Sequence, residues 1–142
     1  MNNPPQTRSA PIAQTGPQQR TLRIAVADDE PEMCAFLQKL CEHLGHQVIV
    51  AVDNGQDLID ACLATHPDLI ITDVIMPEVD GLEALEQILR QVDAKAIVIT
   101  AHDWPELRAR AEQLKTLAYL IKPIGQAELA PPINALAQLG AG

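Results

Sequence analysis

Aromatic and basic side chains are scarce in this chain. Phe, Trp and Tyr make up 2% of the 142 residues, and 10 Lys and Arg residues stand against 19 Asp and Glu residues, for a net charge of −9. Nucleic-acid binding draws much of its affinity from excess cations, so this balance argues against nucleic acid as a direct partner. No apolar run approaches the roughly 18 residues of a membrane span, and we expect no membrane association.

Cysteine is rare as well, and a secretory signal is missing. The 3 cysteines, Cys34, Cys41 and Cys62, lack the close paired spacing of a zinc site. A signal peptide would need an apolar stretch after a basic start, which this chain does not have. We therefore expect reduced thiols and a cytoplasmic location.

The composition of the chain shifts at about residue 21. Residues 1–21 are rich in Pro and Gln and hold almost nothing apolar, so they cannot offset the entropy cost of ordering. We predict a flexible tail there. The rest of the chain, residues 22–142, has the length and composition of one globular domain.

Short β-branched runs alternate with segments of helical period from Leu22 onward. The strand candidates are Leu22–Ala27, Gln47–Val52, Leu69–Thr72, Ala96–Thr100 and Ala118–Ile121. Apolar residues recur between them at helical spacing, as in Leu82, Leu85 and Ile88. This alternation predicts an α/β protein in which helices cover a parallel sheet.

Proline and capping residues suggest where the helices begin and end. Pro31 fits the first turn of the first helix, and Asp103 with Glu106 resembles a capping box before the fourth. Pro131 and Pro132 fall where the fifth helix should be under way. Because proline lacks a donor and restricts the residue before it, we expect that helix to be shortened or broken there.

Polar side chains follow the predicted strands at their carboxyl ends. Asp28 and Asp29 follow the first strand, and Asp73 follows the third. Thr100 ends the fourth strand, and Lys122 follows the fifth. Groups beyond the carboxyl ends of parallel strands line one crevice of an open α/β sheet. If the first and third strands are neighbours, the three carboxylates meet in that crevice.

Three carboxylates in one place repel one another unless a cation or a proton intervenes. Mg²⁺ favours sites with few carboxylates that also receive a phosphoryl group. Lys122 would add a positive charge, and the Thr100 hydroxyl would donate to a phosphoryl oxygen. These groups suit a carboxylate nucleophile that accepts a phosphoryl group, and we predict that Asp73 is this nucleophile.

Four short segments match a known family in their order and separation. They are VADDEP at 26–31, TDVIMPEVDG at 72–81, VITA at 98–101 and YLIKPI at 119–124. Together they resemble the signature blocks of the receiver domain of two-component response regulators, over residues 22–125. The resemblance implies a doubly wound (βα)5 flavodoxin-like sandwich with a parallel five-stranded sheet in the order 2-1-3-4-5.

The resemblance also implies roles for the residues at the strand ends. Asp73 would take a phosphoryl group from a sensor histidine kinase or a histidine phosphotransfer protein. Thr100 and Lys122 would hold the phosphoryl oxygens, and Thr100 with Tyr119 would form the switch pair. The Lys122–Pro123 peptide bond resembles one that is cis in the family.

The same resemblance implies a magnesium site. Asp29 and Asp73, with the backbone carbonyl of Ile75, would bind Mg²⁺ directly, and Asp28 would help through a water molecule. Ile75 and His102 occupy the positions that govern access of water to the phosphorylated aspartate in relatives. Ile75 cannot orient a water molecule by a hydrogen bond, so we expect slow loss of the phosphoryl group.

Simpler interpretations exist for several of these residues. Asp28 and Asp29 fit a solvated turn or a helix cap, Asp73 a loop acid, Thr100 a strand position, Lys122 a surface cation and Tyr119 a packing role. Trp104 either covers apolar surface at a helix end or belongs to a partner-binding face. The other histidines, His43, His46 and His66, lack metal-ligand spacing and are expected to face solvent.

The segment QLKTL at 113–117 departs from the family, in which a glycine-containing turn often precedes the fifth strand.

About 17 residues follow Gly125, too few for an output domain, so we expect no DNA-binding domain. The sequence thus predicts a signalling switch rather than an enzyme, a monomer or weak dimer that acts on a downstream protein target.

Two alternatives remain at this stage. The first is an interaction module with a receiver fold that works without phosphate. The second is a Mg²⁺-dependent phosphohydrolase with an aspartate nucleophile, which would want a second acid where Ile75 stands.

Overall fold

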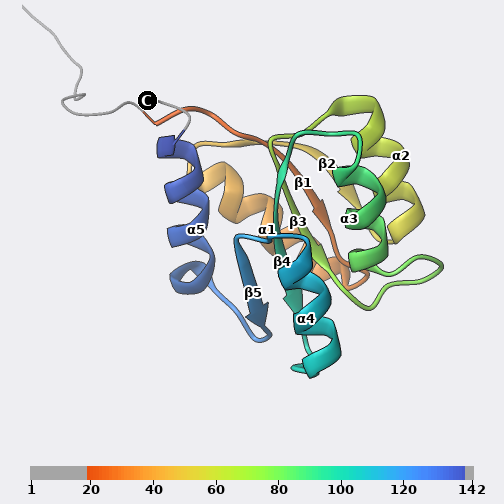
Figure 1. The fold of residues 1–142 in the computed structure, drawn as a ribbon. Coiled ribbons are helices and arrows are strands. Elements are labelled where there is room, and N and C mark those ends of the chain that lie inside the picture. The colour runs from red at the N-terminus through yellow and green to blue at the C-terminus, as the bar shows by residue number, and fades with distance from the viewer. Residues whose placement is uncertain (1–18, 140–142) are drawn as a thin grey trace, which may run out of the picture.

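A single parallel sheet organises the chain, with helices on both of its faces (Figure 1). The computed structural model describes residues 19–139. The strands are β1 (Arg23–Ala27), β2 (Gln47–Val52), β3 (Leu69–Asp73), β4 (Lys95–Thr100) and β5 (Ala118–Ile121). The helices are α1 (Pro31–His43), α2 (Gly55–Thr65), α3 (Gly81–Leu89), α4 (Pro105–Gln113) and α5 (Gln126–Leu139). The strand order is β2-β1-β3-β4-β5, so the predicted fold class and order are confirmed.

The sheet separates two hydrophobic layers. Side chains alternate along β1, so Ala25 and Ala27 join the layer under α2, α3 and α4, whereas Ile24 and Val26 join the layer under α1 and α5. Every residue of β3 is buried, as expected for a central strand covered on both faces. The apolar side chains on these helices therefore hold them against the sheet and fix where its carboxyl ends lie.

Helix α5 corrects one prediction. It runs without a break from Gln126 to Leu139, with Pro131 and Pro132 inside it. Leu129 and Ile133 are fully buried against the sheet, and this burial outweighs the two backbone bonds that the prolines remove. The carbonyls that lose a partner belong to exposed residues, so water can satisfy them.

Helix α4 also begins differently from the prediction, while α1 begins at Pro31 as predicted. The first residue of α4 is Pro105, and its N-cap, Trp104, makes no side-chain cap hydrogen bond. Asp103 does not cap the helix but pairs with Arg108, with 2.8 Å between Oδ1 and Nη2. The capping box was therefore the wrong interpretation of Asp103.

His46 lies in the interior, contrary to the prediction, although His43 and His66 are exposed as expected. The His46 side chain is 6% exposed, and its Nδ1 accepts a hydrogen bond of 3.1 Å from the backbone N–H of Leu22. This donor precedes β1 and needs an acceptor in the interior, which explains why the imidazole turns inward.

Residues 1–18 of the predicted tail lie outside the described residues. The last part of that segment, from Gln19 to Thr21, lies along the domain, where the backbone N–H of Arg20 donates to the carbonyl of Ala137 at 3.2 Å. No helix within residues 19–139 is both long enough and apolar enough to cross a bilayer. The 3 cysteines are free thiols.

The turn between α4 and β5 closes without glycine. Helix α4 ends at Gln113, and Lys115 adopts a left-handed conformation with φ of 57°. This conformation is the one that glycine adopts most readily. In the QLKTL segment, Lys115 therefore takes the left-handed position that glycine would favour.

Candidate functional site

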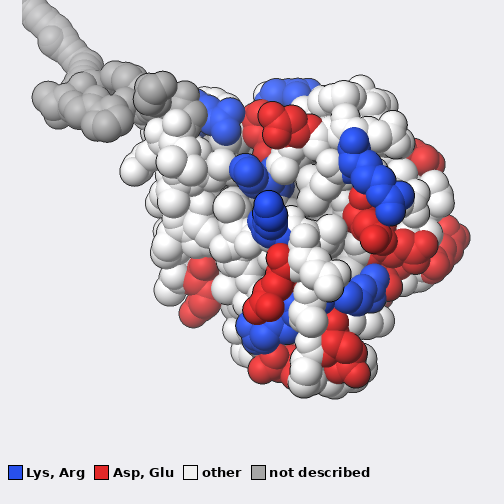
Figure 2. All heavy atoms as spheres, viewed as in Figure 1, with Lys and Arg blue, Asp and Glu red and all other residues white. Residues whose placement is uncertain are grey.

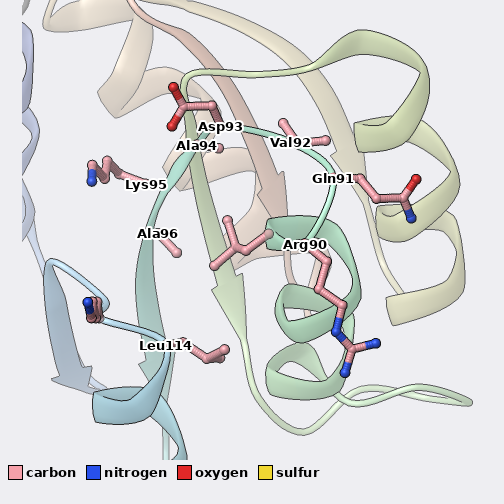
Figure 3. A pocket seen from close by; sticks show the side chains of 10 residues that line it. Arg90, Gln91, Val92, Asp93, Ala94, Lys95, Ala96 and Leu114 are labelled. Atoms are coloured by element: carbon pink, nitrogen blue, oxygen red, sulfur yellow. The ribbon is translucent and has the colours of Figure 1, made fainter.

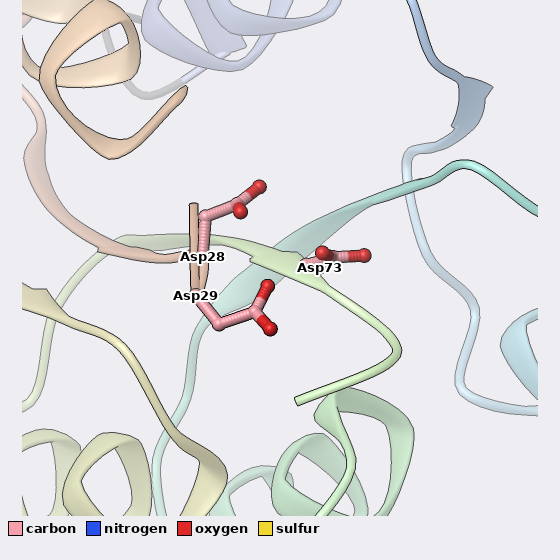
Figure 4. A group of neighbouring side chains, drawn as sticks. All are labelled: Asp28, Asp29 and Asp73. Carbon is pink, nitrogen blue, oxygen red and sulfur yellow. The ribbon is translucent and has the colours of Figure 1, made fainter. Parts of the chain in front are cut away.

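The three predicted carboxylates meet at the carboxyl end of the sheet. Strands β1 and β3 are neighbours with Ala27 opposite Thr72, so Asp28, Asp29 and Asp73 leave the sheet side by side (Figure 4). One carboxylate oxygen from each lies within 4.8 Å of the others. Asp28 and Asp73 are 1% and 5% exposed, while Asp29 is open to solvent. Strand pairing thus concentrates negative charge in a largely buried place.

Lys122 brings the balancing positive charge from the end of β5. Its Nζ lies 2.9 Å from Oδ2 of Asp28 and 3.2 Å from Oδ2 of Asp73. It also donates a hydrogen bond of 2.7 Å to Oε1 of Glu30. The Lys122–Pro123 peptide bond that follows is cis, as expected. The amine therefore sits among three carboxylates.

Burial and charge shift the pKa values of these groups. Burial raises the pKa of Asp73, and the nearby Asp28 carboxylate raises it further, although Lys122 acts in the opposite direction. Burial also raises the pKa of Asp28. For Lys122, burial lowers the pKa, but hydrogen bonds to Glu30 and Asp28 and the charge of Asp73 outweigh it, so the net shift is upward. The ammonium is thus well retained at neutral pH.

The Asp73 side chain is held in a defined orientation. Its Oδ1 accepts a hydrogen bond of 2.7 Å from the backbone N–H of Val74, which leaves Oδ2 directed at Lys122. Gly81, the first residue of α3, lies so close that a Cβ there would overlap the carbonyl oxygen of Asp73. The sequence did not reveal this contact, because a glycine at this position also fits an ordinary turn before a helix.

Thr100 and Tyr119 are connected through the backbone of His102. The buried Thr100 Oγ1 accepts a hydrogen bond of 3.1 Å from the backbone N–H of His102. The Tyr119 hydroxyl donates to the carbonyl of His102, also at 3.1 Å, while the Arg108 guanidinium lies 4.6 Å from the Tyr119 ring centre. The predicted switch residues therefore hold the same backbone segment, although no hydrogen bond joins either side chain to Asp73.

Two predicted residues at the rim, Ile75 and His102, lie in different surroundings. The Ile75 side chain is 46% exposed. The His102 ring stacks on Trp104 with 4.3 Å between ring centres, and Trp104 itself is 49% exposed.

Glu30 was missed as a site residue, although its position directly after the Asp pair was a usable signal.

The residues present fit a hard divalent cation. Among the described residues, the Lys122 amine at 2.9 Å is the one polar partner of the buried Oδ2 of Asp28. Carboxylate oxygens on three neighbouring side chains are the donors that Mg²⁺ prefers. A buried carboxylate oxygen with spare acceptor capacity is consistent with such a site.

Fold and site together define a doubly wound α/β protein with an acidic centre and one lysine at the carboxyl end of its sheet. The family model of the response regulator receiver domain matches residues 24–134. The chain belongs to this family. Receiver domains typically carry phosphorylation and bind Mg²⁺ at an acidic cluster.

The chain is also similar in sequence to individual regulatory proteins. The chain is 32% identical to the transcriptional regulatory protein PdtaR of Mycobacterium tuberculosis over 112 residues, 79% of this chain and 55% of that protein. It is 30% identical to Protein PilH of Pseudomonas aeruginosa over 117 residues, 80% of this chain and 96% of that protein. The chain thus spans about half the length of PdtaR and nearly all of PilH.

A solved structure has the same fold. The CheY-like response regulator receiver domain protein of Methanospirillum hungatei superposes with a TM-score of 0.78 at 21% identity, covering 86% of this chain and 99% of that one.

Proposed function

We propose that this chain accepts a phosphoryl group on Asp73 from a phosphohistidine of a sensor histidine kinase or a histidine phosphotransfer protein. The observation that carries the proposal is the position of the Asp73 Oδ2 atom, 3.2 Å from Lys122 Nζ and beside two further carboxylates. In the reaction, Oδ2 forms a bond to phosphorus while the bond from phosphorus to the histidine nitrogen breaks. The histidine leaves with the electron pair of that bond and takes up a proton.

Lys122 and Thr100 stabilise the product in this proposal. The Lys122 ammonium already reaches Asp73, and it can form an ion pair with a phosphoryl oxygen attached to Oδ2. Asp28, Asp29, Asp73 and the carbonyl of Ile75 would hold Mg²⁺. When bound, this ion supplies positive charge that offsets the carboxylates and the phosphoryl oxygens.

Thr100 and Tyr119 carry the signal onward. The Thr100 hydroxyl is free to donate to a phosphoryl oxygen, and its movement toward that oxygen would lengthen the hydrogen bond that Oγ1 accepts from the N–H of His102. His102 is also the acceptor for Tyr119, so the change at Thr100 reaches the Tyr119 ring through a shared backbone segment. The outcome is altered affinity for a downstream protein.

Loss of the phosphoryl group to water is slow in this proposal. The Ile75 side chain carries no hydrogen-bonding group that would orient an attacking water molecule, and the His102 ring is stacked on Trp104. We therefore expect the phosphorylated form to persist.

Phosphorylation is tested by incubation with acetyl phosphate and Mg²⁺, followed by intact mass measurement. We expect the mass of one phosphoryl group on the wild type and none on Asp73→Ala. The matched control, Asp60→Ala, removes an exposed carboxylate from α2 and should retain the adduct. An unmodified wild type would favour the phosphate-independent module, and rapid multiple turnover of acetyl phosphate would favour the phosphohydrolase.

A further inference from the structure

A second hollow lies at the opposite end of the sheet from the phosphorylation site. It has a volume of about 440 Å³ and is lined by Leu89, Arg90, Gln91, Val92, Asp93, Ala94, Lys95, Ala96, Leu114 and Lys115 (Figure 3). Lys95 begins β4 and Thr100 ends it, so about 17 Å of extended strand separates the two places. The proposed chemistry at Asp73 makes no use of this hollow.

The hollow combines apolar side chains with a basic rim. Leu89, Val92, Ala96 and Leu114 contribute its apolar part. Figure 3 places the Arg90 guanidinium and the Lys95 amine on opposite sides of it. Sites that hold small ligands commonly enclose about 300–1,000 Å³, so this space admits one or two side chains of a partner.

Positive charge at this rim is largely uncompensated. Three of the chain's 10 Lys and Arg residues, namely Arg90, Lys95 and Lys115, line the hollow, in a protein of net charge −9. Within residues 19–139, neither lysine has an acidic partner within 4.0 Å. Arg90 has a loose exposed contact with Glu86, at 3.8 Å. The Asp93 carboxylate, also in the lining, lies on the same side of the hollow as the Lys95 amine (Figure 3) but forms no ion pair with it within 4.0 Å.

One of these cations stands at a strained backbone position. Lys115 has φ of 57°, a left-handed conformation that is less favourable for a residue with a side chain than for glycine. The turn thus places an exposed cation beside the hollow where glycine would be the more stable choice. Figure 2 shows blue side chains on both sides of an uncharged strip on this face.

We propose that this hollow is a docking site for a short acidic segment of a partner protein, which places an aliphatic side chain against Leu89 and Leu114. The uncompensated cations favour carboxylates. The apolar lining favours an aliphatic side chain, which a protein partner can supply and a nucleic acid cannot. Because the chain as a whole is strongly acidic, a long polyanion is repelled, whereas a short segment needs to match only the local cations.

The test uses a fluorescein-labelled peptide of sequence Glu-Leu-Glu-Glu-Leu-Glu and fluorescence anisotropy with the full chain. We expect binding that weakens with salt and that weakens about tenfold or more in the double variant Lys95→Glu/Lys115→Glu. The matched control is Lys39→Glu, an exposed lysine on α1 across the sheet, and it should bind as the wild type does. Equal loss in this control, or none in the double variant, overturns the proposal.

Two further variants separate docking from folding and from phosphorylation. Lys115→Gly relieves the left-handed strain, so we expect it to unfold at higher denaturant concentration while binding the peptide more weakly. Asp73→Ala should bind the peptide like the wild type, so docking and phosphorylation can fail independently. A single-stranded oligonucleotide of equal charge that displaces the peptide would show nucleic-acid binding and contradict the proposal.

Discussion

Lys122 is shared among three carboxylates, and only two of them belong to the predicted metal cluster. The third, Glu30, accepts the shortest of its contacts, at 2.7 Å, although the Glu30 side chain is 64% exposed. An exposed ion pair contributes little to stability. We expect the Glu30 carboxylate to compete with a phosphoryl group on Asp73 for the Lys122 amine.

We expect Glu30→Gln to accept a phosphoryl group from acetyl phosphate about twofold faster than the wild type, because the weaker contact frees the Lys122 ammonium. The rate is measured from the growth of the phosphorylated mass. Glu32→Gln, which changes an exposed acid in the first turn of α1, serves as the control. A slower Glu30→Gln would show that Glu30 positions the lysine productively.

Asp73 makes stability depend on pH. Its folded pKa is raised by burial and by Asp28, so its contribution to stability is present below the ordinary carboxyl pKa and is lost as pH rises through the folded pKa. In the absence of Mg²⁺, we expect Asp73→Asn to be more stable than the wild type at pH 7, by about 1 kcal/mol. The difference should shrink as pH falls toward 3.8, the ordinary value for the group.

Urea unfolding at several pH values measures this effect, with Asp60→Asn as an exposed control. A variant less stable than the wild type at pH 7 would mean that the Asp73–Lys122 ion pair outweighs the cost of burying the carboxylate.

The sequence predicted the acids and the lysine of the site because their proximity follows from the strand ends alone. Asp28, Asp73 and Lys122 converge wherever these strands lie in this order. The position of Glu30 after the same strand end made it a candidate, but neither its contact with Lys122 nor the burial of His46 follows from strand order. The contact of Glu30 depends on the direction of its side chain, and the burial of His46 depends on a backbone donor at Leu22.

Helix α3 begins in direct contact with Asp73, the proposed nucleophile. Its first residue, Gly81, donates its N–H to the carbonyl of Val74 at 2.7 Å and leaves no room for a Cβ against Asp73. The end of β3 and the start of α3 are therefore packed directly against each other.

We expect Gly81→Ala to lower the free energy of unfolding by about 1–3 kcal/mol and to slow phosphorylation, because the backbone of Asp73 must shift. Chemical unfolding and the acetyl phosphate assay measure the two effects. Gly125→Ala is the matched control, since a Cβ there meets only Oε1 of Glu128, at 3.7 Å. Equal stability of the two variants would contradict the close packing at Gly81.

Sequence rules for helix ends succeeded at α1 and failed at α4 and α5. Pro31 begins α1 as predicted, but Asp103 pairs with Arg108 and the prolines of α5 lie inside a continuous helix. Local preferences amount to about 1–3 kcal/mol each, and burial of a helix face against a sheet exceeds them. Such tertiary contributions are not visible in a local pattern.

At the scale of the whole molecule, the alternation of strands and helices predicted the fold class, and the family resemblance supplied the strand order. The alternation could not show which strands are neighbours in the sheet, because several strands present buried side chains on both faces. Each end of every predicted strand lies within one residue of the observed end, since strongly apolar strands have well-defined limits.

Binding of Mg²⁺ should stabilise the entire fold. A ligand that binds only the folded state, at a hundred times its Kd, raises the free energy of unfolding by about 2.7 kcal/mol. We expect a matching rise in Tm with Mg²⁺, and a change in the fluorescence of Trp104 on the rim. Asp29→Asn should lose most of both responses, whereas Asp60→Asn should keep them. A wild type indifferent to Mg²⁺ would argue against the magnesium site.

The complete burial of β3 has a consequence for local unfolding of the sheet. We expect the amide hydrogens of this central strand to exchange with deuterium only when the molecule opens as a whole, and those of β5, half-buried throughout, to exchange through smaller fluctuations. Asp73, the proposed nucleophile, would then be attached to the strand that opens least often, and Lys122 would follow an edge strand that opens more readily.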